Sequence, residues 1–209
     1  MLNTKIARLF LIACLLLVSA TTRAEAGCAI VYGANWSFLF AAPEKWEVAC
    51  PVNDRSGVVV ALWPEGTPWA KAPGIMYATV SGKNDFSLEG FAQDELARFR
   101  VESPALQVQV VDPIPLSNKK QALVRKLTGD QFSNHEMIAY ADGGNVYFIF
   151  VLSSRTQETF ERLLPSFKEF VSSVSPMAIK FESKGKTPNL TVERDAPQAA
   201  SPLAPRPSP

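Results

Sequence analysis

The chain has 209 residues, of which 47% are hydrophobic and 20% are charged, and its formal net charge is +1. This length accommodates one domain with a tail, and the apolar content is ample for a core. Because the charge is nearly balanced, no basic field favours nucleic acid or anionic lipid, and we expect neither as a partner.

The N-terminus has the pattern of an export signal. Residues 1–8 carry two positive charges and no negative one, residues 9–18 are an apolar run, and small residues follow. This order is typical of a secretory signal, and the run is shorter than the roughly 20 residues that a membrane span needs. We predict a signal peptide over residues 1–26, cleaved after Ala26 or, as an alternative, after Ala24. The mature chain is then periplasmic or secreted, without a transmembrane span, and has a formal charge of about −1.

Two other fates of the N-terminus stay open. The apolar run could be an uncleaved anchor helix, or a lipid could be attached to a cysteine and hold a structural protein in the envelope. Cys28 follows two small residues, but Glu25 occupies the position where lipid attachment favours an apolar residue. Cys14 lies inside the apolar run instead of after it.

The mature chain keeps Cys28 and Cys50, an even number in an oxidising compartment. We predict a disulfide between them, which contributes about 3 kcal/mol in the chain-entropy model. Two buried thiols or a redox site are the alternatives, but the spacing is not C-x-x-C. Two cysteines without a neighbouring histidine make a poor zinc site, and we expect no metal and no cofactor.

Apolar runs between turn residues predict a series of short strands. The strand that begins at Leu106 is expected to end before Pro113. The last two strands form a hairpin, because residues 142–144 (Asp-Gly-Gly) tolerate positive φ. The predicted strands are residues 36–40, 46–50, 58–63, 75–80, 106–111, 121–127, 135–140 and 145–152.

Two segments have helical periodicity. Ser87 is a candidate N-cap for a helix that begins at Leu88 and carries an apolar stripe as far as Phe99. A closing helix over residues 160–174 keeps one apolar face throughout. It contains Pro165, where we expect a kink or a fresh helix start.

The order of elements predicts an α+β fold, with an antiparallel sheet covered by two or more helices. We assign the domain to residues 27–178. From Pro176 onward prolines accumulate and aromatic residues nearly vanish. We therefore predict a disordered, proline-rich tail over residues 179–209, either a docking segment for a partner or a solvated terminus.

Two stretches resemble PsbP-like proteins. Residues 38–46 have an aromatic strand followed by Pro43 and Trp46, similar to the opening of that family. Residues 146–148 and the helix after them resemble its closing strand and helix. The resemblance covers about residues 33–175 and implies an α/β/α sandwich. It also implies a non-enzymatic accessory or binding role, as in most members; no motif here supports a photosynthetic one.

The inventory of catalytic side chains is thin. His135 is the single histidine, and its neighbour Glu136 should face the opposite side of a strand. No G-x-S-x-G nucleophile elbow is present. A hydrolase with a serine–histidine site assembled across the fold around His135 is the alternative function. The basic pairs Lys119-Lys120 and Arg125-Lys126 are interpreted as a solvated face, and the acidic residues near 85–95 lack calcium-loop spacing.

The loop between Trp63 and Trp69 is the leading candidate for a contact surface. Prolines stiffen it, and aromatic side chains in stiff loops often anchor interfaces. The alternative is that one or both tryptophans pack onto the sheet. The favoured function is therefore an exported, non-catalytic accessory or binding protein. Its partner would be another envelope protein or a small ligand; its oligomeric state is left open.

Overall fold

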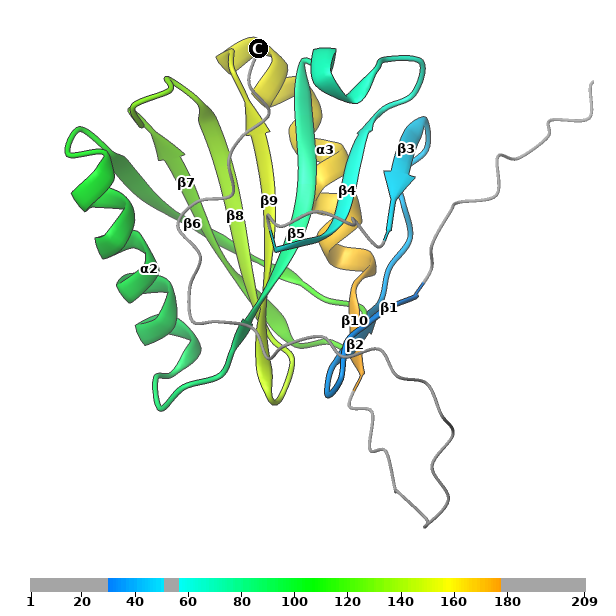
Figure 1. The fold of residues 1–209 in the computed structure, drawn as a ribbon, viewed down its shortest axis with the longest axis vertical. Coiled ribbons are helices and arrows are strands. Elements are labelled where there is room, and N and C mark those ends of the chain that lie inside the picture. The colour runs from blue at the N-terminus through cyan, green and yellow to red at the C-terminus, as the bar shows by residue number, and fades with distance from the viewer. Residues whose placement is uncertain (1–29, 51–56, 178–209) are drawn as a thin grey trace, which may run out of the picture.

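The computed structural model describes residues 30–50 and 57–177, which form two antiparallel sheets and two long helices (Figure 1). The smaller sheet has the order β1 (Ile30–Tyr32), β2 (Ser37–Leu39) and β10 (Ser175–Met177). The larger sheet has the order β3 (Trp46–Ala49), β4 (Val58–Pro64), β5 (Gly74–Gly82), β9 (Val146–Ser154), β8 (His135–Asp142), β7 (Gln121–Thr128) and β6 (Gln107–Pro115).

The two long helices cover opposite faces of the larger sheet. Successive side chains of a strand point to opposite faces, so alternate residues of β9 report what lies on each side. Phe148 and Phe150 join the core that contains α3 (Gln157–Ser173). Ile149 and Val151 join the cluster that contains α2 (Leu88–Glu102). The predicted α+β class, with helices covering an antiparallel sheet, is confirmed.

Aromatic rings fill the space between the sheet and α3. Phe150 and Phe170 pack edge to face, with ring centroids 5.5 Å apart. The smaller sheet contributes to this core through Phe38, whose ring contacts that of Phe148 with a centroid distance of 5.0 Å. Phe38, Phe148, Phe150 and Phe170 are fully buried. Edge-to-face geometry is the arrangement that aromatic quadrupoles favour, so this face is held by apolar packing.

Both helices begin at the expected kind of residue. The Ser87 hydroxyl accepts a hydrogen bond from the Gly90 amide at 3.1 Å, as predicted. Thr156 does the same for α3. That helix runs continuously through Pro165, so it does not start afresh there, and the alternative of a kink stays a prediction. Pro165 is exposed, and the buried residues before and after it keep the helix on the sheet despite one lost hydrogen bond.

The end of β6 also corrects a prediction. The strand does not stop before Pro113 but continues to Pro115. β6 is an edge strand, and its register with β7 shifts between Val111 and Ile114. Proline is tolerated at edges and bulges because no ladder hydrogen bond is lost there. The predicted turn after β8 is confirmed, with Gly144 at a φ of 90°.

The strands β1 and β10 were not anticipated. Each has three residues, and each pairs only with β2 in the smaller sheet. Such short segments carry too little periodicity to be recognised. The predicted signal peptide, Cys28 and the tail over 179–209 lie outside the described residues. Among the helices of the described part, none has both the length and the apolar content to cross a membrane.

Candidate functional site

The two tryptophans of the candidate loop contact each other. Trp63 lies near the end of β4 and Trp69 begins a short 3-10 helix, η1 (Trp69–Lys71). Their ring centroids are 5.3 Å apart and the ring planes cross at 77°. Both side chains are half-buried, so each ring keeps part of its surface in solvent.

Backbone hydrogen bonds fix the loop that holds this pair. The Thr67 amide donates to the Pro64 carbonyl at 3.3 Å, which closes a β-turn with Gly66 at a φ of 74°. A positive φ at the third residue is the type II arrangement, which glycine adopts without strain. The Gly66 amide also donates to Glu47 Oε1 at 3.0 Å. The loop therefore presents the two rings in a preset geometry.

The pair lies on the sheet face opposite α3. Leu62, the neighbour of Trp63 in β4, belongs to the α3 core, so Trp63 points to the other side. Figure 1 shows α2 near β6, β7 and β8, whereas β4 lies beyond β5 on the other half of the sheet. The tryptophans therefore occupy the half of this face that is distant from α2.

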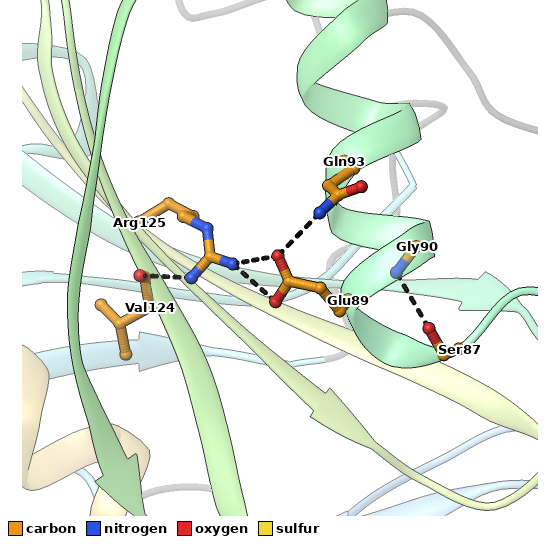
Figure 2. Close-up of polar contacts among 6 residues, drawn as sticks. All are labelled: Ser87, Glu89, Gly90, Gln93, Val124 and Arg125. Carbon is orange, nitrogen blue, oxygen red and sulfur yellow. Dashed lines mark hydrogen bonds and ion pairs between the residues drawn. The ribbon is translucent and has the colours of Figure 1, made fainter.

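Under α2 lies a polar contact that the sequence did not reveal. Arg125 on β7 donates through Nη2 to both carboxylate oxygens of Glu89, at 2.6 and 2.7 Å (Figure 2). Its Nη1 donates to the Val124 carbonyl at 2.9 Å. Arg125 is 6% exposed, so its assignment to a solvated face was wrong. The Arg125 guanidinium lowers the pKa of the Glu89 carboxyl.

A second pair of polar side chains, Glu95 and Tyr140, lies nearby on the α2 side of the sheet. Glu95 Oε2 and the Tyr140 hydroxyl are buried side by side, and among the described residues neither makes a hydrogen bond of ordinary geometry. Burial raises the pKa of the Glu95 carboxyl, and the neighbouring Tyr140 hydroxyl offsets part of that effect. Burial, followed by the Glu95 charge, raises the pKa of Tyr140 well above its ordinary value. On the same strand as Tyr140, the buried Glu136 accepts a hydrogen bond from Ser153 at 2.9 Å.

His135 begins β8, and its ring lies 6.2 Å from that of Phe160 on the α3 side. Glu136 faces the α2 side, so the two neighbours point to opposite faces of β8, as predicted. The cross-strand neighbour of His135 is Ser154, whose hydroxyl donates to the Pro73 and Thr156 carbonyls. This serine is therefore turned toward backbone acceptors. Within residues 30–50 and 57–177, no group of three or more His, Cys, Asp or Glu side chains could hold a metal.

A shallow groove of about 230 Å³ lies between β6 and α3. Its walls are mainly apolar, and the charged groups Asp112 and Lys168 border it. Apolar contributions come from Val111, Ile114, Leu164 and Phe167. It is at the small end for a ligand site, and it holds few convergent polar groups that would orient a ligand.

Comparison with known proteins gives similarities of fold alone. No family model and no curated protein matches the chain. Among solved structures, the chain is similar to cyanobacterial PsbP (CyanoP) from Synechocystis sp. PCC 6803, with 14% identity and a TM-score of 0.46. That match covers 76% of this chain and 99% of the other. The sequence resemblance had pointed to PsbP-like proteins.

A crystal structure from Bacteroides thetaiotaomicron VPI-5482 is also similar, with 12% identity and a TM-score of 0.43. The match covers 69% of this chain and 46% of that one, so the chain spans less than half of that neighbour. Because both TM-scores are below 0.5, neither likeness carries an argument about function. The α+β class rests on the sheets and helices described above.

The buried polar residues under α2 were missed, yet one signal was present. On β7, Leu123, Arg125 and Leu127 alternate along one face. A charged residue between two inward-facing leucines indicates a buried ion with a partner, because an unpaired buried charge is strongly unfavourable. Its position beside Lys126 in the sequence obscured that signal, since the two side chains point to opposite faces of the strand.

Proposed function

We propose that this chain is an exported, non-catalytic accessory or binding protein whose contact surface is the Trp63–Trp69 loop. The observation that carries the proposal is the edge-to-face tryptophan pair held by the turn at Gly66. Large aromatic side chains in a fixed geometry lose little conformational entropy on binding, so they suit the centre of an interface. The partner is another envelope protein or a small ligand.

The test compares partners captured by chemical crosslinking in the envelope fraction. The wild-type chain is compared with a Trp63→Ala/Trp69→Ala double variant. A matched control is Val101→Ala, because Val101 is 82% exposed and lies on α2, away from the loop. We expect the double variant to lose specific partners that the control retains. An unchanged partner set would contradict the proposal.

Export and the disulfide are further parts of the proposal. We infer that the chain is cleaved after Ala26 and that Cys28 then pairs with Cys50, which is half-buried just after β3. Intact mass spectrometry of the mature protein, with and without reductant, measures both. The expected mass begins at Gly27 and rises by two hydrogens on reduction. A lipid adduct on Cys28, or an unchanged mass on reduction, would contradict this part.

The serine–histidine hydrolase remains the alternative function. No contact among the described residues favours it, since Ser154 donates to backbone carbonyls. Replacing His135 by alanine discriminates between the two functions. A loss of an esterase or amidase activity at unchanged stability would support the hydrolase.

A further inference from the structure

We propose that the Trp63–Trp69 pair binds the chain's own C-terminal segment, residues 202–206, in a polyproline II conformation. The inference rests on the proposed function, because it names an occupant for the same surface. It assigns the pair a proline-rich basic segment as ligand, carried in the same molecule.

The geometry of the pair suits proline. Ring planes that cross at 77° form a corner in which the face of one indole meets the edge of the other. Proline-rich segments dock on such aromatic surfaces because the pyrrolidine ring is compact and apolar and restricts the backbone φ. The entropic cost of binding is small, since proline-rich segments already populate polyproline II when free.

The chain carries a segment of the required kind. Residues 202–206 read Pro-Leu-Ala-Pro-Arg, and two more prolines follow at 207 and 209. Polyproline II has three residues per turn, so Pro202 and Pro205 lie on the same edge. Both rings can therefore meet the tryptophan corner together.

The segment is tethered within reach of the pair. β10 ends at Met177, about 25 residues before Pro202, and a random-coil chain of that many residues has a root-mean-square span of about 28 Å. Figure 1 places β10 at one end of the larger sheet and the β4–β5 connection at the other. A nine-residue strand such as β5 is about 30 Å long. Because the span and the separation match, tethering raises the effective concentration of the segment at the pair.

Acidic side chains next to the pair complement Arg206. Glu47 is the cross-strand neighbour of Trp63, and Glu65 follows in the turn; both are exposed. The exposed Lys45 and Lys71 also border the loop and offset part of this attraction. We therefore expect Arg206 to contribute less to binding than the two prolines.

The test uses the full mature chain and the indole N–H signals of its four tryptophans, measured by NMR. Trp63→Phe and Trp69→Phe variants assign the two loop signals. A Pro202→Ala/Pro205→Ala variant is then compared with the matched control Pro188→Ala/Pro197→Ala, which alters the same number of prolines elsewhere in the tail. We expect the first variant to shift both loop signals and leave those of Trp36 and Trp46 unchanged. Arg206→Ala should give a smaller shift, and the matched control none.

The inference would be overturned if the indole N–H signals of Trp63 and Trp69 do not shift in the Pro202/Pro205 variant, or if they shift equally in the control variant. Repeating the comparison after tenfold dilution separates the tail of the same molecule from that of a second copy. A shift that fades on dilution would overturn the intramolecular assignment. In a third outcome, the Trp63/Trp69 variant loses its crosslinked partners but the indole signals do not shift when the tail is changed. This outcome would support the proposed function and contradict the tail as occupant. Indole signals that shift on replacement of Pro202 and Pro205, together with an unchanged partner set, would support the tail as occupant and contradict the proposed function.

Discussion

The two faces of the larger sheet are stabilised in different ways. On the α3 face, buried phenylalanine rings from β2, β9 and α3 interlock, and the core has few polar groups. On the α2 face, the apolar cluster is smaller and is accompanied by Arg125, Glu89, Glu95 and Tyr140. The α3 face should therefore respond to changes of volume, whereas the α2 face should respond to changes of charge and pH.

The α2 face also contains two carboxyl groups with opposite tendencies. Glu89 is ion-paired and its pKa is lowered, so its contribution is present above its ordinary pKa and is lost as the pH falls through the folded value. Glu95 is buried and its pKa is raised. Its protonated form is favoured in the folded state, so stability falls as the pH rises from the ordinary pKa through the folded value. The two glutamates of α2 therefore change the free energy of unfolding in opposite directions as the pH rises.

Phe167→Ala should have the largest effect on stability. Phe167 lies on α3 and is fully buried against the core, so its truncation removes apolar contacts and leaves a cavity. We expect a loss of about 3–5 kcal/mol in the free energy of unfolding, measured by urea denaturation and nearly independent of pH. Val101→Ala on exposed α2 surface is the control and should change stability by less than about 0.5 kcal/mol. A loss below about 1 kcal/mol for Phe167→Ala would contradict the view that apolar packing stabilises the α3 face.

Glu89→Ala should cost about 2 kcal/mol at neutral pH, because it leaves the buried Arg125 guanidinium without its carboxylate. The expected loss is below that for a fully buried pair, since the Glu89 side chain is 47% exposed. Urea denaturation between acid and neutral pH should show the loss shrinking as Glu89 is protonated in the wild type.

The double variant Glu89→Ala/Arg125→Met is the matched control for that cost. Replacing both partners of a buried ion pair by apolar groups is often close to neutral. We therefore expect the double variant to recover most of the lost stability. A double variant as unstable as Glu89→Ala would show that the unpaired guanidinium is not the cause.

Glu95→Gln should stabilise the protein at neutral pH by about 1 kcal/mol, because a neutral amide of the same shape avoids the cost of burying a carboxyl group whose pKa is raised by that burial. The difference from wild type should be absent below the ordinary glutamate pKa and should grow as the pH rises. Thermal unfolding across this range measures it. Glu102→Gln, at the exposed end of α2, is the control. A destabilised Glu95→Gln at neutral pH would contradict the expected sign.

Lys83→Ala should have the smallest effect. Lys83 Nζ lies 2.8 Å from Asp142 Oδ2, but the two side chains are 33% and 39% exposed. Exposed ion pairs contribute about 0.5 kcal/mol or less and are screened by salt. Urea denaturation at low and high salt should show a small loss that vanishes in salt. A salt-independent loss would assign the effect to the contact of Lys83 with the Tyr147 ring instead.

Most of the fold could be predicted because its longer elements have regular patterns. The apolar runs along β8 and β9, the helix cap at Ser87 and the turn at Asp142–Gly144 are local signals. The errors fell where a neighbouring element decides the outcome. Pro113 is tolerated because β6 is at an edge, and Pro165 because α3 is held by the sheet on both sides of it. Neither property can be inferred from residues nearby in the sequence.

The candidate site was also predictable from the sequence only in part. The prolines, Gly66 and the two tryptophans could be recognised from the sequence alone. Their edge-to-face contact required β4 and η1 to be brought together. The Glu89–Arg125 pair under α2 was missed because the two residues are far apart in the chain, and the position of Arg125 between two leucines was the single local signal of its burial.

The sequence by itself determined the α+β class, the order of the main elements and the Ser87 cap of α2, since hydrophobic period and capping are local properties. It also carried the pattern of an export signal and a proline-rich tail. Only the tertiary structure decided which helix covers which face and which charges are buried. It alone decided that Trp63 and Trp69 touch. Those outcomes depend on packing between distant segments, where burial changes the free energy of a charge or a ring far more than any neighbour in the sequence does.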